Sequence, residues 1–148
     1  MIRTIEVLNY RALRYVRIDV TNFQVLVGPN ASGKSTLFDV VSFVRDILQA
    51  GLERAFLGDP RLGIAPRCFN PKDLTWCGQG GDIEIVLEIE LPESVRQAAR
   101  HPLARYELAI ATDGELSFKT ETLWLRQPTG NDHHKAKAQR SLFFPNRK

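Results

Sequence analysis

Residues 28–36 decide the fold of this chain, and they read Gly28-Pro29-Asn30-Ala31-Ser32-Gly33-Lys34-Ser35-Thr36. They fit the pattern G-x-x-x-x-G-K-[ST], in which a glycine-rich loop holds phosphate groups at the start of a helix. The two glycines allow backbone angles and close approaches that a Cβ would block. The backbone N–H groups of the loop can then turn inward as an anion-binding nest, and the following helix adds the positive end of its dipole.

The sequence on both sides of this loop supports the same interpretation. An apolar run at residues 23–27 (Phe-Gln-Val-Leu-Val) stands directly before the loop and predicts a buried strand. Strand, glycine loop and helix is the order that the motif requires. We expect the helix to run from residue 34 to about 53, with Gly51 fraying it and Gly58 ending it. Its apolar residues recur at helical spacing: Leu37, Val40, Val41, Val44, Ile47 and Leu48.

The side chains of the loop have distinct expected roles. The Lys34 ammonium is expected to bridge the β- and γ-phosphates of a nucleotide as a point charge. The Ser35 hydroxyl is expected to ligate Mg²⁺, because this hard cation prefers oxygen ligands. The other residues of the phosphate cradle are Gly28, Pro29, Asn30, Ala31, Ser32, Gly33 and Thr36. A glycine-rich turn without any ligand is the alternative, and the flanking strand and helix patterns argue against it.

The rest of the chain is dominated by strand patterns. Apolar and polar residues alternate at residues 82–91, and shorter strands are predicted at residues 2–8 and 15–20. Residues 105–110 and 116–125 predict a hairpin, with Asp113-Gly114 at its turn. Between these patterns we expect a long connection at residues 58–81 and a short helical turn at 92–100. The alternation at residues 82–91 indicates one core face and one acidic, wet face. The fold class is α/β.

Size and composition limit the classes of protein that this chain can represent. With 148 residues it has room for one domain with a sizeable core. No run of eighteen apolar residues and no signal pattern is present, which predicts a cytoplasmic protein without a membrane partner. The formal net charge is +3, and part of the excess lies in a basic segment at residues 128–148, which is either a solvated tail or a contact to phosphate. Cys68 and Cys77 are expected to be free thiols.

A hydrolytic enzyme with this loop also needs an acidic residue at the end of a second buried strand, which holds Mg²⁺ through water. The nearest candidate is Asp113, after the apolar residues 108–111. Thr112 interrupts that pattern and Gly114 follows it, so a hairpin turn is the better interpretation of Asp113. The sequence therefore predicts a phosphate-binding loop without its usual acidic partner.

The loop resembles the Gly-x-Asn-Gly-x-Gly-Lys-Ser/Thr loop of the SMC/RecF-like ABC ATPases. Residues 5–13 (Ile-Glu-Val-Leu-Asn-Tyr-Arg-Ala-Leu) are similar to the strand and Asn-Phe-Arg turn with which members of that group open. Within the group, the chain looks most like AAA family ATP-binding proteins of the anti-phage, overcoming-lysogenization-defect type. Ala31 stands where the group commonly has glycine, and alanine is small enough there if the residue does not need a positive φ.

This resemblance implies a P-loop NTPase fold, similar to the N-terminal lobe of an ABC or SMC head with an antiparallel β subdomain. It implies ATP and Mg²⁺ as cofactors. Residues 1–127 would form the ATP-binding lobe, divided into residues 1–57, 58–81 and 82–127, and residues 128–148 would lead into a missing C-terminal lobe. The signature segment, the strand bearing Asp-Glu and the switch histidine would lie in that second lobe. Partners implied by the group are a second ATPase head and DNA.

The resemblance also gives expected roles to two residues outside the loop. Arg11 is expected to contact the nucleotide near the ribose or a phosphate, and an exposed turn arginine is an equal alternative. Gln79 resembles the family's Q-loop glutamine, although a polar residue in a flexible turn is the favoured interpretation.

Three functions remain open at this stage. The first is the ATP-binding lobe of an SMC/ABC-like AAA ATPase, which hydrolyses ATP only when the missing elements complete it. The second is a nucleotide-binding module or truncated fragment without turnover. The third is a phosphate-loop kinase of a small metabolite, against which the sequence shows no arginine-rich lid and no acidic strand end after the helix.

Overall fold

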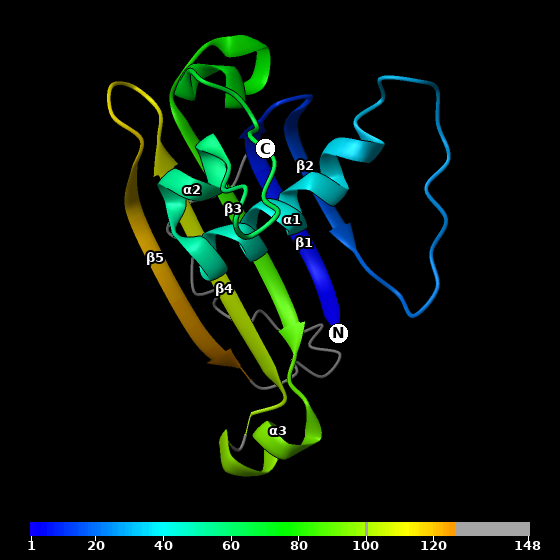
Figure 1. Cartoon of the computed structure of the whole chain (residues 1–148). Helices are drawn as coiled ribbons and strands as arrows, with labels where there is room; N and C mark the ends of the chain where they lie inside the picture. Colours follow the sequence, from blue (N-terminus) through cyan, green and yellow to red (C-terminus); the bar gives the residue numbers. More distant parts are fainter. Residues whose placement is uncertain (100, 127–148) are drawn as a thin grey trace.

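The chain folds around one antiparallel sheet whose strands match the alternating patterns in the sequence. The computed structural model describes residues 1–99 and 101–126. The strands lie in the order β2-β1-β3-β4-β5, and each neighbouring pair is antiparallel (Figure 1). Their bounds are β1 Ile2–Tyr10, β2 Leu13–Asp19, β3 Asp82–Glu90, β4 Leu103–Ala111 and β5 Ser117–Arg126. The mixed α/β class is therefore confirmed.

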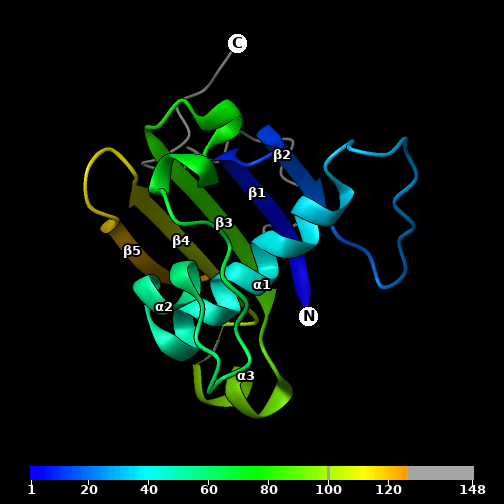
Figure 2. The ribbon, with the colours of Figure 1, turned by 45° about the horizontal axis from the view of Figure 1, so that its top comes forward.

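Two helices cover one face of this sheet, as Figures 1 and 2 show. α1 (Lys34–Ala50) lies across the strands, and α2 (Leu52–Leu57) follows it after one residue. α1 buries Leu37, Val40, Phe43, Val44 and Ile47. They pack on the inward side chains of the strands, which include Ile5, Val7, Ile83, Ile85, Leu87, Leu108 and Ile110. Burial of each such side chain contributes about 1.5–3 kcal/mol, so this core is what holds α1 against the sheet.

The single helix predicted for residues 34–53 is two helices. Gly51, with φ 86° and ψ 165°, lies between α1 and α2 and donates its N–H to the Ile47 carbonyl at 2.8 Å. Glycine adopts this conformation without the penalty that a Cβ would bring, so the chain can turn there. Leu48, which we predicted within the apolar stripe, is 64% exposed, whereas Phe43 is fully buried.

The largest departure from the sequence prediction is at residues 23–27. This segment forms no strand. It is part of an extended loop that leaves the sheet at the end of β2 and leads back to the start of α1 (Figures 1 and 2). Phe23, Val25 and Val27 are 84%, 65% and 90% exposed. The prediction of a buried strand is wrong, because no strand in the described part of the chain lies beside this segment to pair with its backbone.

The sheet face opposite the helices carries charged side chains, but several residues on it are buried from solvent. Arg105 on β4 pairs with Glu107 at 2.6 Å and with Glu88 of β3 at 3.0 Å. The Glu107 side chain is 5% exposed, and Val86, on the same face of β3 as Glu88, is fully buried. The predicted wet face of residues 82–91 is therefore wrong in this respect, since its acidic residues belong to a partly buried ion-pair layer.

The connection at residues 58–81 docks on the turn between β1 and β2. It contains two short 3-10 helices, η1 (Pro71–Leu74) and η2 (Trp76–Gly78). The Asn9 side chain accepts from the Trp76 N–H and donates to the Gly80 and Asp82 carbonyls, each at 3.0 Å. These contacts fix the end of the connection next to the residues that join β1 to β2.

The remaining elements follow the sequence prediction closely. α3 (Glu93–Ala99) is the helical turn expected at residues 92–100. In the described ranges, no helix is long and apolar enough to cross a membrane. The basic segment at residues 128–148 lies outside the described residues, and the division of the chain into an ATP-binding lobe and a tail stays a prediction.

Candidate functional site

The 28–36 loop bends back on itself immediately before α1. The Ser32 N–H donates to the Pro29 carbonyl at 3.3 Å and closes a turn. Gly33, the residue before the helix, has φ 89°. A Cβ at Gly33 would lie 2.8 Å from a side-chain carbon of Leu13, and a Cβ at Gly28 would lie 3.0 Å from the Ser32 hydroxyl oxygen. Both glycines therefore have a steric reason to be present.

The Lys34 ammonium lies within this bend. Its Nζ donates to the Gly28 carbonyl at 2.8 Å, to the Pro29 carbonyl at 2.6 Å and to the Ser32 hydroxyl at 3.2 Å. All three acceptors are neutral. A multiply charged anion adds a Coulomb attraction that these neutral acceptors do not provide, so it would compete well for this ammonium.

The start of α1 presents four backbone N–H groups that meet no acceptor within residues 1–99 and 101–126. They belong to Gly33, Lys34, Ser35 and Thr36. No side chain caps the helix, and its first turn holds no acidic residue. Unsatisfied N–H groups together with the positive end of the helix dipole attract anions. The Ser35 side chain adds an exposed hydroxyl at the same place.

Ala31 adopts the left-handed conformation, with φ 63°. We expected alanine to be acceptable here provided that the residue needs no positive φ, and that condition is not met. A Cβ in this region costs roughly 1–2 kcal/mol relative to glycine. The loop therefore keeps its bend despite a local penalty at Ala31, and Asn30 next to it lies exposed in the same turn.

Arg11 lies near the loop, but its guanidinium is engaged elsewhere. The turn between β1 and β2 reaches the loop through Leu13, which packs on Gly33. Arg11 itself, with φ 49°, donates from Nη1 to Asp39 Oδ2 on α1 at 2.8 Å. Its backbone N–H donates to the Leu74 carbonyl at 2.7 Å. The structure thus places the Arg11 guanidinium beside Asp39 of α1, three residues after the end of the loop, and its contact with a nucleotide stays a prediction.

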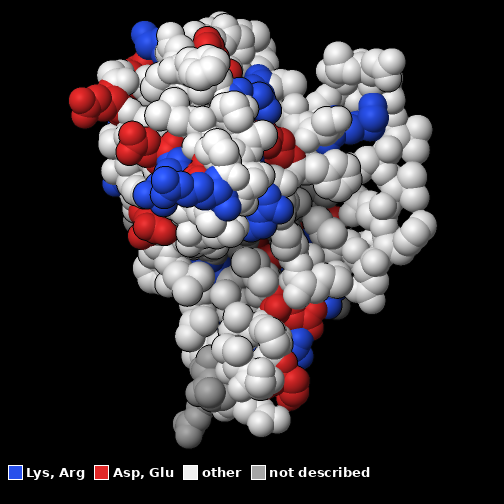
Figure 3. Space-filling model, viewed as in Figure 1, with Lys and Arg blue, Asp and Glu red and all other residues white. Residues whose placement is uncertain are grey.

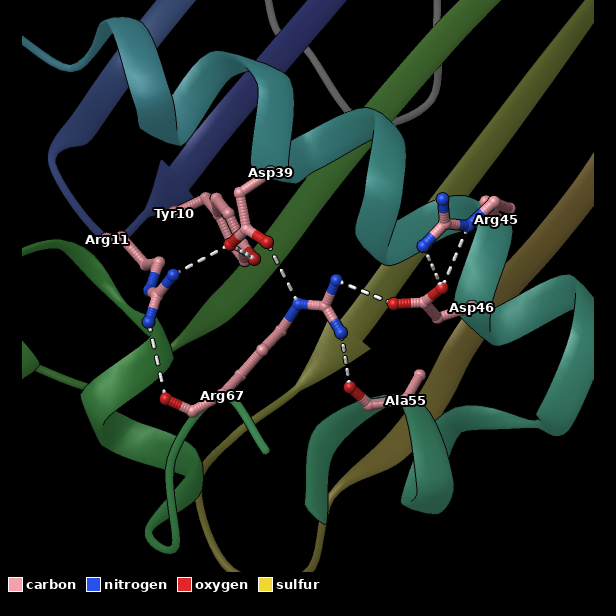
Figure 4. A network of polar contacts seen from close by, with 7 residues as sticks. All are labelled: Tyr10, Arg11, Asp39, Arg45, Asp46, Ala55 and Arg67. Carbon is pink, nitrogen blue, oxygen red and sulfur yellow. Dashed lines mark hydrogen bonds and ion pairs between the residues drawn. The ribbon is translucent and has the colours of Figure 1, made fainter. Parts of the chain in front are cut away.

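Asp39 is the point at which three elements meet (Figure 4). Its Oδ2 accepts from the Tyr10 hydroxyl at 2.7 Å as well as from Arg11. Its Oδ1 accepts from Nε of Arg67, in the long connection, at 3.2 Å. Asp39 therefore ties α1 to β1 and to residue 67, and so fixes the helix whose first turn forms the anion-attracting end.

Arg67 extends this network along α1. Its Nη2 donates to Asp46 at 2.8 Å and its Nη1 to the Ala55 carbonyl at 2.6 Å, while its guanidinium lies 4.9 Å from the centre of the Phe43 ring. Asp46 also pairs with Arg45 at 2.8 Å. The side chains of Arg67 and Asp46 are only 8% and 4% exposed, so each depends on the other for compensation of its charge.

The network changes the acidity of its members. Burial raises the pKa of Tyr10, and the negative charge of Asp39 raises it further. Burial alone would raise the pKa of Asp46, but hydrogen bonds from Arg45 and Arg67 outweigh it and lower the pKa below its usual value. Burial opposes the charge of Arg67, and its bond to Asp46 more than compensates and raises the pKa. These last two pKa shifts favour the charged forms of Asp46 and Arg67, the two partners of the most deeply buried ion pair of the network.

Gln79 lies at the end of η2, in an exposed position. Its N–H donates to the Trp76 carbonyl at 3.3 Å, as expected of a turn residue. No described contact brings Gln79 to the 28–36 loop. The role of a Q-loop glutamine stays a prediction for this residue.

Asp113 occupies the turn of the β4–β5 hairpin, where the sequence placed it. Its Oδ2 accepts from the Gly81 N–H at 3.2 Å, and a Cβ at Gly80 would collide with its carboxylate at 2.4 Å.

Within the described residues, no group of three or more His, Cys, Asp or Glu side chains is placed to hold a metal ion. Cys68 and Cys77 are free thiols, and burial raises the pKa of Cys68.

Sequence reasoning identified the loop but missed Asp39 and Arg67. Asp39 lies three residues after Thr36 on the polar side of the predicted helix, which marks it only as a solvated helix residue. Arg67 stands in a connection without periodicity. Their meeting depends on how residues 58–67 fold back over α1, and no local pattern encodes that path.

Comparisons with known proteins agree with this architecture. Residues 1–51 match the family described as AAA ATPase domain. A solved structure described as "Structural biochemistry of ATP-driven dimerization and DNA stimulated activation of SMC ATPases" is similar in fold, with a TM-score of 0.53 and 19% sequence identity. The similarity covers 86% of this chain and 72% of that chain. No curated protein sequence matches the chain.

Proposed function

We propose that this chain is an ATP-binding lobe of an SMC/ABC-like AAA ATPase with a P-loop NTPase fold. The observation that carries the proposal is the group of four N–H groups at Gly33–Thr36, which have no acceptor in the described part of the chain, beside the Lys34 ammonium. A triphosphate matches both features, because it brings concentrated negative charge and many acceptor oxygens. The family match over residues 1–51 covers this same part of the chain.

The residues of the loop fit a Mg²⁺–ATP ligand. In our proposal, the Gly33–Thr36 amides hold the phosphate oxygens, and Lys34 exchanges its bonds to the Gly28 and Pro29 carbonyls for bonds to phosphate. The exposed Ser35 hydroxyl supplies one oxygen ligand to Mg²⁺, whose other ligands come from the nucleotide and water. When bound, Mg²⁺ neutralises phosphate charge. Gly28 keeps the cradle open, since a Cβ there would crowd Ser32.

We further propose that hydrolysis requires elements supplied by another lobe. The exposed apolar residues at 23–27 stand immediately before the loop, and a strand in this position needs a neighbour to pair with its backbone. The structurally similar protein is described as undergoing ATP-driven dimerization and DNA-stimulated activation. By analogy, a second ATPase head and DNA are the proposed partners, and nucleotide use suits the cytoplasm.

Nucleotide binding without turnover is the second candidate. It is favoured by the position of Asp113, whose carboxylate is engaged by the Gly81 N–H in a hairpin turn. Measurement of phosphate release from ATP, for this chain alone and for this chain mixed with a second ATPase head, distinguishes the two. Release only in the presence of the second head supports the first candidate.

Calorimetric titration with ATP tests the proposal. We expect saturable binding that Mg²⁺ strengthens, and its loss in Lys34→Ala, because removal of the paired charge costs about 2–5 kcal/mol. Lys72→Ala, which removes an exposed lysine of η1, is the matched control and should bind as the wild type does. Equal titration curves for wild type and Lys34→Ala would refute the assigned role.

A further inference from the structure

A cavity of about 300 Å³ lies between α1 and residues 63–66 of the long connection. Its charged wall is the network of Figure 4, from Arg11 and Asp39 through Arg67 to Asp46 and Arg45. Figure 3 shows basic and acidic side chains side by side over this α1–α2 region. The cavity is separate from the 28–36 loop, since no residue of that loop lines it.

The arginine N–H donors of this wall and its carboxylate oxygens are not used to the same extent. Every carboxylate oxygen of Asp39 and Asp46 already accepts from an arginine. Each guanidinium carries five N–H groups, and Arg45 uses only Nε and Nη2, both towards a single Asp46 oxygen. Each carboxylate oxygen thus has at least one arginine partner while Arg45 has unused N–H groups, and the three arginines and two aspartates of the wall leave a net charge of +1.

The arginines differ in how firmly they are held. Arg67 is 8% exposed and anchored by Asp39, Asp46 and the Ala55 carbonyl, so its guanidinium is a fixed part of the cavity wall. Arg45 is 68% exposed, and its one partner is the adjacent Asp46. Exposed ion pairs contribute little, about 0–1 kcal/mol, so Arg45 can turn towards a ligand at small cost.

We propose that this cavity binds a compact oxyanion, a small molecule bearing a phosphate or carboxylate group, at the exposed Arg45 guanidinium, with the positive charge of Arg67 in the same wall. Both chemistries offer acceptor oxygens to the unused N–H groups of Arg45, and a guanidinium binds either one in bidentate fashion. The volume is at the lower limit for ligand cavities, which suits a compact anion better than a whole nucleotide. Anion binding in the cavity does not require nucleotide binding at the 28–36 loop, because the two share no residue.

Two-dimensional NMR of the arginine Nε–H groups in the full chain tests the proposal. The titrations use inorganic phosphate and malonate, each compared with sodium chloride at equal ionic strength. The background is Lys34→Ala, which removes competing binding at the loop. We expect saturable shifts at Arg45 and Arg67, and the stronger of the two ligands shows which oxyanion the cavity prefers.

Two matched variants make the result decisive. Arg45→Gln should weaken binding about tenfold, as expected for loss of a hydrogen bond to a charged group. Arg54→Gln is the control, because Arg54 is also a well-exposed helical arginine, 64% against 68%, and is paired with an aspartate, Asp59. No saturable shift with either anion, or equal weakening in both variants, would overturn the proposal. Thermal unfolding of both variants shows whether each is folded.

Discussion

At the scale of single residues, Ala31 is the position where sequence and geometry disagree. The loop resembles a family loop that has glycine here, and the structure holds Ala31 at φ 63°. Gly33, two residues later, shows the same sign of φ with the residue type that suits it. The bend of the loop is thus determined by its surroundings more strongly than by the preference of residue 31.

Replacement of Ala31 by glycine should stabilise the loop. Relief of the left-handed strain favours the folded state, while the greater freedom of glycine in the unfolded chain offsets part of the gain. We expect a net increase of about 0.5–1 kcal/mol in the free energy of unfolding, measured by urea denaturation. A loss of stability would show that residue 31 does not adopt a positive φ.

Ser35→Ala should separate metal binding from phosphate binding. The hydroxyl is the proposed Mg²⁺ ligand, whereas the backbone amide of residue 35 remains available to phosphate in the variant. We expect ATP affinity without Mg²⁺ to be unchanged, and the strengthening by Mg²⁺ to be largely lost, in calorimetric titrations at several metal concentrations. An equal loss of affinity without Mg²⁺ would contradict the metal role.

The residues of the loop could be predicted from sequence because their spacing is local. Gly28, Gly33 and Lys34 act within a few residues of each other, and the structure brings them together. Asp39 and Arg67 are twenty-eight positions apart in the chain, and they meet at 3.2 Å only after the connection has folded over α1. Local patterns carry no information about such a meeting.

At the scale of elements, the position of α1 is set by two different forces. Its apolar stripe packs on the sheet, and Asp39 and Asp46 bind Arg67 on its outer side. Packing is non-directional, whereas the buried ion pairs fix the direction and register of the helix. The network therefore holds the anion-attracting end of α1 at a defined place beside the turn between β1 and β2.

Asp46→Asn should destabilise the chain in a manner that depends on pH. The pKa of Asp46 is lower in the folded chain than in the unfolded chain, so its carboxylate stabilises the fold above about pH 4. This contribution is lost as the pH falls through the folded pKa. We expect a loss of about 2–4 kcal/mol at pH 7, because the buried Arg67 loses one of its two carboxylate partners, and a smaller difference at pH 3.

Urea denaturation of wild type and Asp46→Asn between pH 3 and pH 7 measures this effect. Asp59→Asn is a useful comparison, since Asp59 pairs with the exposed Arg54 at 3.6 Å and should matter much less. A difference between wild type and Asp46→Asn that stays constant with pH would contradict the role given to the ion pair.

The segment at residues 23–27 should contribute little to the stability of this chain. Val25→Thr replaces an exposed methyl group, so we expect a change within about 0.5 kcal/mol. The same substitution at Val40, which is fully buried on α1, introduces an unpaired hydroxyl and should cost about 1–3 kcal/mol. Equal losses in thermal unfolding of the two variants would show that residues 23–27 are packed.

The elements that the sequence predicted well are those with a strict period and a partner nearby in the chain. The hairpin of β4 and β5 has both, with its turn at Asp113-Gly114. Residues 23–27 have strand composition without a neighbouring strand in the described part of the chain, and they remain exposed. Composition indicates what a segment is suited to form, whereas pairing decides whether it forms.

At the scale of the whole molecule, the chain has a packed part, which is the sheet with its two helices, and an exposed part, which is the segment before the 28–36 loop. The five-stranded sheet, α1 and α2 enclose one core. The segment that leads into the 28–36 loop stands apart from that core, as the space-filling view shows (Figure 3). This arrangement agrees with the proposal that the chain is one lobe of an ATPase and that a second lobe supplies the missing strand neighbour.

The chemical shifts of the backbone amides, recorded while ATP and Mg²⁺ are added to the full chain, test the central claim most directly. The account predicts that the largest changes fall on Gly33, Lys34, Ser35 and Thr36, whose N–H groups have no acceptor among residues 1–99 and 101–126. It also predicts that these changes are absent in Lys34→Ala. Saturable changes confined to other residues, or unchanged amides at positions 33–36, would contradict it.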